Sequence, residues 1–416
     1  MIQYGNHNEM DTIKETIDNE RVIAKYQPIV SLVKKKIVAF EGLTRGVNIL
    51  NSEIIPPLEM FEYARKHDMT IALDRLCREK CIEGFKSIHR MNNKWNLFIN
   101  VDASVIEKLE GSNYFLNQIL KGKISPKNIV IEINEARTGN LNVLERFTNT
   151  YRKKGFLIAL DDVGAGFSNL DRISIIKPDI IKLDALLVRN IQDSYHKQEI
   201  FKCITGLANR IGAIVVAEGV ETQIELNYVV EFGAHLVQGY FFSKPEFINN
   251  NMIKKVNDKI ENAVNSYKEH MILKARRDRL YRYKIDKFLS KFVKELRVNP
   301  VNNFDNLILE FIDKYKNLDI ECAYILDETG IQITDTIFSK EKSGIHPDGI
   351  VFSPAVKGED NSLKRYYYEL MNSKIDNYFS EPYISYATGE ICITLSRIFT
   401  HNNYKKYILC IDIAKG

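Results

Sequence analysis

Short apolar runs alternate with amphipathic stretches of helical period between Lys25 and Pro245. The apolar runs are Lys25–Leu32, Ile37–Leu43, Leu97–Val101, Ile129–Ile133, Leu157–Asp161, Ile180–Leu183, Ile214–Ala217 and Val237–Phe241. Strands that alternate with helices predict parallel pairing in an α/β fold. Eight such strands within about 220 residues predict a TIM-like (β/α)8 barrel. An open, doubly wound sheet fits the same periodicity and remains the alternative.

The first two strands depart from this pattern, because only Val33–Lys36 separates them. A crossover helix needs a longer segment, whereas a hairpin fits this length. We therefore predict that the first strand of the barrel is antiparallel to the second.

The pattern changes after Pro245. Apolar residues recur at steps of three and four from Ile253 to Leu296, with neither Gly nor Pro, which predicts a long helix or two helices. Its many basic residues predict a solvated face rather than a nucleic-acid or membrane surface. Asn299–Pro300 ends this stretch. The predicted domains are a barrel over residues 1–247, a helical linker over 248–300 and a smaller α+β domain over 301–416.

Within the α+β domain we predict one helix, Asp305–Tyr315, followed by several strands. The strand candidates are Cys322–Leu326, Ile350–Ser353, Tyr383–Tyr386, Ile391–Arg397 and Lys406–Ile413.

Composition narrows the class of protein. Of 416 residues, 45% are apolar and 27% are charged, which is ordinary globular usage. The net charge of +4 shows no general basic bias, so we expect no polymeric nucleic acid as a partner. No apolar run approaches the roughly 18 residues of a membrane span, so we expect no membrane insertion. The six cysteines are scattered, and we interpret them as reduced thiols of a cytoplasmic protein.

Polar side chains stand at or near the carboxyl ends of the predicted barrel strands. They are Glu41, Asn100, Glu132, Asp161, Asp162, Lys182, Asp184, Glu218 and Gln238. Any single one of them would be interpreted as a cap or a solvated loop residue. Parallel barrel strands are normally apolar, however, and every strand from the second onward carries such a residue. The carboxyl ends of barrel strands meet at one face, where active sites are built, so we expect one common site.

The residue types at these strand ends indicate a site for divalent cations. The oxygen donors are Glu41, Asn100, Glu132 and Asp161, with Asp162 and Glu218 for a second cation. Such donors suit Mg²⁺ or Mn²⁺ rather than zinc or copper. Two such cations can clamp a phosphodiester and lower the pKa of a bound water. Lys182 would then stabilise charge on the phosphate or orient the water.

The stretch from Tyr26 to Pro245 resembles the EAL-domain cyclic di-GMP phosphodiesterases. The matching segments, in the order of the family, are Tyr26–Val30, Glu41–Arg45, Asn100–Asp102, Glu132–Glu135, Asp161–Gly166, Lys182–Asp184, Glu218–Glu221 and Gln238–Tyr240. This resemblance covers a little over half of the chain. It implies an EAL barrel that opens cyclic di-GMP to linear pGpG with two Mg²⁺ or Mn²⁺ ions.

The resemblance also implies roles for single residues. The ligands of the first ion would be Glu41, Asn100, Glu132 and Asp161. The ligands of the second would be Asp161, Asp162 and Glu218, with Glu218 also a candidate base. Lys182 matches the catalytic lysine, and Glu135 matches the glutamate that steadies the loop after the fifth strand. The substrate-facing positions would be Gln27, Leu43, Arg45, Asp184 and Gln238.

Some positions depart from the family pattern, although no metal-binding or catalytic side chain is missing. Alanine is usual where this chain has Gly42, and serine is usual where it has Asp102. Asn134 replaces a threonine. Val163 and Ala165 replace an aromatic residue and a threonine in the loop that positions the second metal ion.

The C-terminal domain resembles the PAS- or Cache-like sensory domains that follow some EAL barrels. The segments that carry this resemblance are Glu381–Ser385, Thr388–Glu390 and Thr394–Ser396. It implies a small-molecule ligand that regulates the barrel, and the alternative is an α+β domain that only mediates dimerisation. Barrels of the family commonly pair behind the loop after the fifth strand, so the resemblance also implies a homodimer.

Two further functions remain open beside the enzyme. One is a catalytically quiet cyclic di-GMP receptor that signals through a protein partner. The other is a different metal enzyme on a barrel, which would explain the strand ends but not the ordered motifs.

Overall fold

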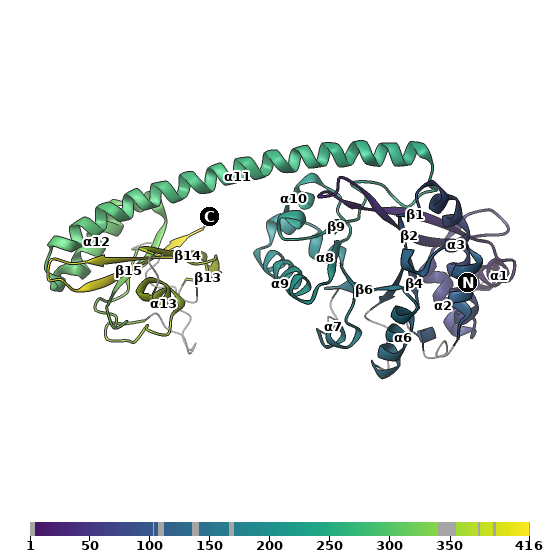
Figure 1. Ribbon diagram of the computed structural model, residues 1–416, viewed down its shortest axis with the longest axis horizontal. Coiled ribbons are helices and arrows are strands. Elements are labelled where there is room, and N and C mark those ends of the chain that lie inside the picture. The colour runs from purple at the N-terminus through teal and green to yellow at the C-terminus, as the bar shows by residue number, and fades with distance from the viewer. Residues whose placement is uncertain are drawn as a thin grey trace. The chain divides into compact units, whose positions relative to one another are not determined.

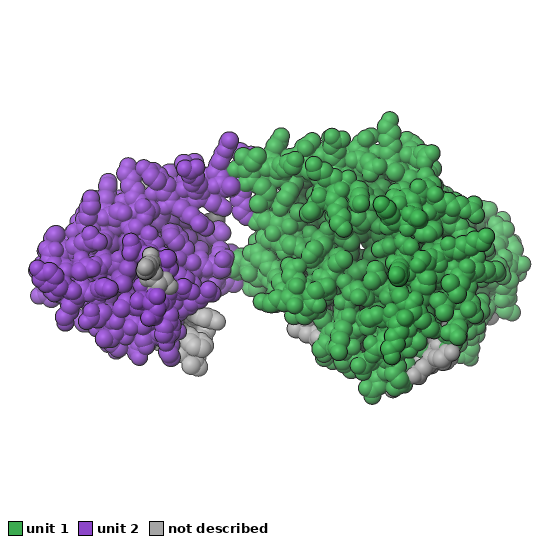
Figure 2. All heavy atoms as spheres, viewed as in Figure 1, with its two compact units in different colours: residues 1–272 green, residues 273–416 purple. Residues whose placement is uncertain are grey.

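The computed structural model describes residues 5–102, 104–106, 112–134, 141–165, 170–339, 355–372, 375–385 and 388–415 (Figure 1). The chain divides into two compact units, residues 1–272 and 273–416, which Figure 2 shows in green and purple. The boundary falls inside one long helix, α11 (Asn250–Val298). Each unit contains its own hydrophobic core.

Eight strands of the first unit close into a ring. In order they are β1 (Val22–Ser31), β9 (Leu236–Val237), β8 (Ile214–Ala217), β7 (Ile180–Leu183), β6 (Leu157–Val163), β5 (Ile129–Asn134), β4 (Asn96–Val101) and β2 (Lys36–Val47). β1 is antiparallel to both of its neighbours, and all other neighbours in the ring are parallel. The predicted barrel with an antiparallel first strand is confirmed. Because β1 pairs with β9, the alternative of an open sheet is wrong. A short strand, β3 (Ile54–Ile55), pairs with β2 outside the ring.

Helices surround the barrel and bury its outer surface. They are α1 (Gly5–Asp18), α2 (Pro57–Lys66), α3 (Thr70–Met91), α5 (Tyr114–Lys121), α6 (Leu141–Lys153), α7 (Leu170–Ile176), α8 (Ala185–Val188), α9 (Tyr195–Ile211) and α10 (Gln223–Glu231), with 3₁₀ turns η1 (Pro126–Asn128) and η3 (Ile191–Asp193). The apolar faces of α3 and of the helices that follow it join the outward-facing strand residues in the largest hydrophobic cluster, whereas those of α1 and α2 form a separate cluster with the start of α3. None of the described helices is long and apolar enough to cross a membrane.

The inside of the barrel contains one compact apolar layer. Each strand except the short β9 contributes one buried residue to it: Ile29, Ala39, Phe98, Val130, Ala159, Ile180 and Val216. Since side chains alternate along a strand, residues two positions further on point to the same side. The side chains two residues beyond these therefore form the next layer inside the barrel.

The last barrel strand is shorter than we predicted. The run Val237–Phe241 does not continue as a strand, because β9 already ends at Val237. Gly239 lies so close to the backbone of Val220 that an added Cβ would stand 2.0 Å from the Val220 carbonyl oxygen. This contact turns the chain away from the sheet, and Gln238 follows β9 instead of lying on it.

Helix α11 contributes to both hydrophobic cores. Its first turns place Val256 and Ile260 in the core of the barrel unit. Its last turns place Phe288 and Phe292 in the core of the second unit, where Phe292 stacks on Phe311 with ring centroids 3.6 Å apart. The apolar stripe predicted from the sequence is thus buried at its two ends.

The second unit is built on a six-stranded antiparallel sheet. The strands are β10 (Ile320–Asp327), β11 (Ile337–Phe338), β12 (Asn377–Phe379), β13 (Tyr383–Ile384), β14 (Ile391–Thr400) and β15 (Lys406–Ala414). Its helices are α12 (Phe304–Lys314) and α13 (Arg365–Asn372), with 3₁₀ turns η4 (Val301–Asn303) and η5 (Lys316–Leu318). The predicted α+β class is confirmed. The strand candidate Ile350–Ser353 lies outside the described residues.

Candidate active site

The polar residues singled out in the sequence form the layer above the apolar one. Two residues beyond each apolar residue from β2 to β8 lie Glu41, Asn100, Glu132, Asp161, Lys182 and Glu218. The two-residue period of a strand therefore points all of these side chains into the barrel at its carboxyl end. The structure confirms that these strand ends build one common site.

Lys182 occupies the centre of this layer. It is only 1% exposed, and its Nζ lies 2.5 Å from Glu132 Oε1, 2.6 Å from Glu218 Oε1 and 2.9 Å from Asp161 Oδ1. Glu41 Oε2 is 3.7 Å away. Burial lowers the pKa of Lys182, but the surrounding carboxylates outweigh it and raise that pKa well above its ordinary value. Lys182 is therefore charged and holds the carboxylates around it.

Side-chain amides fix the orientation of Glu41. Asn100 Nδ2 donates to Glu41 Oε1 at 3.1 Å and to Glu132 Oε2 at 2.8 Å. Gln238 Nε2 donates to Glu41 Oε2 at 2.5 Å and to Gln27 Oε1 at 3.0 Å. Gln27 in turn donates to the backbone carbonyl of Ser243. These bonds connect strands from opposite ends of the barrel sequence and hold the site together.

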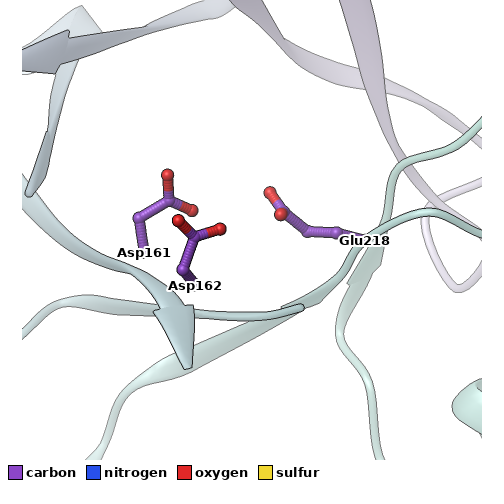
Figure 3. A group of neighbouring side chains, drawn as sticks. All are labelled: Asp161, Asp162 and Glu218. Atoms are coloured by element: carbon purple, nitrogen blue, oxygen red, sulfur yellow. The ribbon is translucent and has the colours of Figure 1, made fainter. Parts of the chain in front are cut away.

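Asp161 and Asp162 both face the site although they are neighbours on β6. Asp162 has a φ of 56°, and the pairing of β6 with β7 shifts its register at this point. This left-handed conformation interrupts the alternation that would turn the second carboxylate away. Carboxylate oxygens of Asp161, Asp162 and Glu218 all lie within 4.8 Å of one another (Figure 3). Asn134, a departure from the family pattern, donates a hydrogen bond to Asp162.

The charges of the site fit two divalent cations. Its five carboxylates, those of Glu41, Glu132, Asp161, Asp162 and Glu218, face one ammonium group. When all five are ionised, four negative charges lack a counter-charge, and two divalent cations would neutralise them. Burial, followed by the neighbouring charges, raises the pKa of Glu132 and of Glu218 well above the usual range. All donor atoms are oxygens, which Mg²⁺ and Mn²⁺ prefer.

The predicted substrate-facing residues lie in different surroundings. Leu43 and Arg45 line a cavity of about 210 Å³ beside Asn100, and Arg45 Nη1 donates to the Thr44 carbonyl at 2.7 Å. Asp184 caps α8, where its Oδ1 accepts the Leu186 N–H at 2.7 Å. Gln27 and Gln238 are buried beside Glu41 as described above. Glu135 lies outside the described residues.

Sequence reasoning missed one buried ion pair at this cavity. Asp74 and Arg78 on α3 are 2% and 1% exposed, with Asp74 Oδ2 and Arg78 Nη2 2.6 Å apart. The sequence did contain a signal for this pair, since Asp74 and Arg78 stand at positions i and i+4 within the apolar face of α3. Charged residues on such a face are rarely buried unless they are paired or bind another group.

The backbone of Gly42 lies so close to Cys81 on α3 that no side chain fits between them. A Cβ at position 42 would stand 2.9 Å from Cys81 Sγ and 3.1 Å from Cys81 Cβ. We expect Gly42→Ala to lower the free energy of unfolding by about 1–3 kcal/mol through overpacking. Cys81→Ala in the same chain should recover most of this loss, as measured by urea denaturation.

Gly206 in α9 provides a matched control, because the nearest atom to an added Cβ there is 3.9 Å away. Gly206→Ala should stabilise the protein by about 1 kcal/mol. If the changes in unfolding free energy caused by Gly42→Ala and Cys81→Ala are strictly additive, the two side-chain positions do not interact.

Cation binding should depend on pH. Burial, followed by repulsion from Asp161, raises the pKa of Asp162 to about 6. A cation that binds these carboxylates must displace their protons, so Mn²⁺ affinity should rise from about pH 5 to about pH 7 and protons should be released. Titration calorimetry in two buffers of different ionisation enthalpy measures both effects. Asp162→Asn should reduce the proton release, and an affinity that does not change over this range would contradict the expectation.

Comparison with known proteins gives the family. An EAL domain model matches residues 10–245. The EAL-domain containing protein YkuI of Bacillus subtilis, itself uncharacterised, is 25% identical over 399 residues, which cover 93% of this chain and 94% of YkuI. Its crystal structure, in complex with the substrate c-di-GMP and calcium, superposes with a TM-score of 0.74 at 24% identity and covers 98% of this chain and 99% of that one.

Two further matches cover a little over half of this chain. The cyclic di-GMP phosphodiesterase PdeA of Borreliella burgdorferi is 27% identical over 237 residues, or 56% of this chain and 35% of PdeA. The structure of Klebsiella pneumoniae BlrP1 with manganese and cyclic di-GMP has a TM-score of 0.50 at 29% identity and covers 54% of this chain and 56% of that one. This chain therefore spans most of YkuI but only about a third of PdeA. Since the family model covers more than half of its residues, the chain belongs to the EAL domain family.

Proposed function

We propose that this protein hydrolyses cyclic di-GMP to linear pGpG with two bound Mg²⁺ or Mn²⁺ ions. The observation that carries the proposal is the buried ammonium of Lys182 among carboxylates that it cannot neutralise alone. The names of PdeA and of the BlrP1 and YkuI complexes support cyclic di-GMP as the substrate. The manganese in the BlrP1 complex supports the choice of metal.

When bound, the two cations supply Lewis acidity that polarises the phosphodiester and lowers the pKa of the attacking water. We assign the first to Glu41, Asn100, Glu132 and Asp161, and the second to Asp161, Asp162 and Glu218. Glu218 accepts the proton of the attacking water as general base. Lys182 stabilises the charge that develops on the phosphate in the transition state. One P–O bond of the ring breaks as the bond to the water oxygen forms, and the released ribose oxygen takes up a proton and leaves as a hydroxyl group.

Other residues bind and orient the dinucleotide in this proposal. Arg45 donates a charge-assisted hydrogen bond to a phosphate oxygen. Leu43, Gln27, Gln238 and Asp184 contact the dinucleotide or hold the groups that do. Glu135 steadies the loop after β6 that carries Asp162.

Lys182→Ala tests the chemistry separately from binding. Because Lys182 acts mainly in the transition state, kcat should fall by at least about 100-fold, while cyclic di-GMP affinity changes far less. Chromatographic detection of pGpG with Mg²⁺ or Mn²⁺ measures kcat, and EDTA should abolish it. Full turnover in EDTA would contradict the two-metal mechanism, whereas an unchanged kcat in Lys182→Ala would remove the lysine from the mechanism. A wild type that binds cyclic di-GMP but forms no pGpG would instead support the receptor function.

We further propose that the second unit is a PAS- or Cache-like sensory domain that regulates the barrel through a homodimer. A small-molecule ligand would bias the loop after β6 through α11, which has neither Gly nor Pro between residues 254 and 297. Such regulation requires that the ligand bind two states of the protein with different affinity. We also propose a cytoplasmic protein, which its six free cysteines support.

A chain that ends after Ile272 tests this regulation. This end keeps Val256 and Ile260, which belong to the barrel core, whereas an end near Phe247 would remove them. We expect the full chain to be a dimer and the shortened chain to differ from it in kcat or KM. Light scattering and pGpG formation measure both. If the full chain and the shortened chain are both monomers with the same kcat and KM, regulation through a dimer would be contradicted.

A further inference from the structure

The second unit contains a cavity of its own beside the last turns of α11. Helix α13 and strands β14 and β15 supply the rest of its walls, so it lies wholly within this unit. Its volume is about 620 Å³, within the roughly 300–1,000 Å³ of pockets that hold small-molecule ligands. Part of its lining is apolar and consists of Val293, Leu370, Met371, Ile375, Ile398 and Phe399. The cavity therefore has the size and the apolar surface to hold a small organic molecule.

The charged part of the lining is mostly basic. Lys294 and Arg297 come from α11, Arg397 from β14 and Lys406 from β15, whereas Asp376 is the only acidic residue among the described residues that line the cavity. The dipole of a helix favours basic residues near its carboxyl end, which would explain Lys294 and Arg297 but not the cations that two strands add. Four cations from three elements thus surround one cavity.

Arg397 differs from the other cations because it is already neutralised. Its Nη2 forms an ion pair with Asp286 on α11, and its Nη1 donates to Ser290 Oγ at 2.9 Å. Its Nε donates to Asn377 Oδ1 on β12. Arg397 therefore has a structural role, in which it joins α11 to two strands of the sheet.

The other three cations have no such partners. The side chains of Lys294, Arg297 and Lys406 form neither ion pairs nor hydrogen bonds within the part of the chain that the structure describes. Asp376 can offset one of these charges, so two positive charges remain. A phosphate monoester carries a charge of about −1.5 to −2 at pH 7 and offers three acceptor oxygens. Such a group matches both the charge and the donors of this cavity.

Hydrogen bonds hold the walls of the cavity in place. The N–H of Asn402 donates to the Arg297 carbonyl at 3.1 Å, and His401 Nε2 lies 2.8 Å from the Asn299 carbonyl oxygen. Both contacts fix the turn between β14 and β15 against the end of α11. The backbone that carries the three free cations therefore needs little rearrangement when a ligand binds.

We propose that this cavity binds a small organic phosphate monoester. Lys294, Arg297 and Lys406 donate charge-assisted hydrogen bonds to the phosphate oxygens. The carbon skeleton of the ligand packs on the partly exposed side chains of Met371 and Ile398. This inference rests on the proposed sensory role of the second unit, because it names the class of ligand and the site that binds it.

Titration of phenyl phosphate into the full chain, followed by ³¹P NMR, tests the proposal. The buffer is freed of divalent cations, so the carboxylates of the barrel site repel the anionic probe. Phenyl phosphate should bind saturably, and Arg297→Met or Lys406→Met should each weaken binding by about tenfold, as expected for one hydrogen bond between charged groups. No saturable binding up to about 10 mM, or equal affinity in wild type and both variants, would overturn the proposal.

Lys291 provides the matched control on the same helix. It is exposed, as Lys294 is, and stands three residues before it, but it does not line the cavity. Lys291→Met should leave the affinity for phenyl phosphate unchanged, and a loss equal to that in Arg297→Met would overturn the assignment to this cavity. Benzenesulfonate has the same ring but one negative charge, so it should displace phenyl phosphate only at higher concentration. Displacement at equal concentration would contradict the match to two positive charges.

A kinetic measurement separates this site from the rest of the proposed function. Saturating phenyl phosphate should change kcat or KM for pGpG formation in wild type but not in Arg297→Met, because regulation requires the ligand to favour one state of the protein. Binding with unchanged kinetic constants would support the site and contradict regulation through it. Binding by a protein that forms no pGpG would support the site and contradict the proposed hydrolysis.

Discussion

The ammonium of Lys182, buried within 2.5–2.9 Å of three carboxylates, is the interaction on which the rest of the site depends. A buried charge is tolerated only where opposite charges and hydrogen bonds replace its water. Here the carboxylates come from β5, β6 and the residue after β8, so a single strand cannot supply them. Loss of the lysine would leave the carboxylates to repel one another. The barrel therefore closes around a polar centre that is satisfied only when β2, β5, β6, β7 and the end of β8 are in place.

The two-residue period of side chains along a strand places the apolar residues inside the barrel, and it also places the polar layer there. Ala159 and Asp161 on β6, or Ile180 and Lys182 on β7, lie on the same side of their strands. A slip of one residue in any strand would turn the polar residue outward and an apolar residue into the site. The register of the barrel and the geometry of the active site are thus a single constraint.

Two departures from the family pattern have identifiable partners in this chain. Gly42 leaves room for Cys81, whose sulfur would otherwise meet a Cβ at 2.9 Å. Asn134 lies where its amide donates to Asp162, and so helps to hold a carboxylate in a left-handed conformation. These pairs join residues distant in sequence, which is why a departure that looks disruptive in one segment is compatible with the site.

The sequence by itself determined the positions of the strands, the antiparallel first pair and the set of oxygen donors, because strand period and strand-end polarity are local properties of the chain. The closure of the sheet into a barrel was decided by the pairing of β1 with β9. It also placed the long helix after the barrel, since its apolar stripe has a helical period. The end of β9 at Val237 was decided by the close approach of Gly239 to Val220, which no local pattern records. The capping role of Asp184 and the buried pair of Asp74 and Arg78 were likewise decided in three dimensions. Burial and pairing depend on which elements meet, and only the tertiary structure brings those elements together.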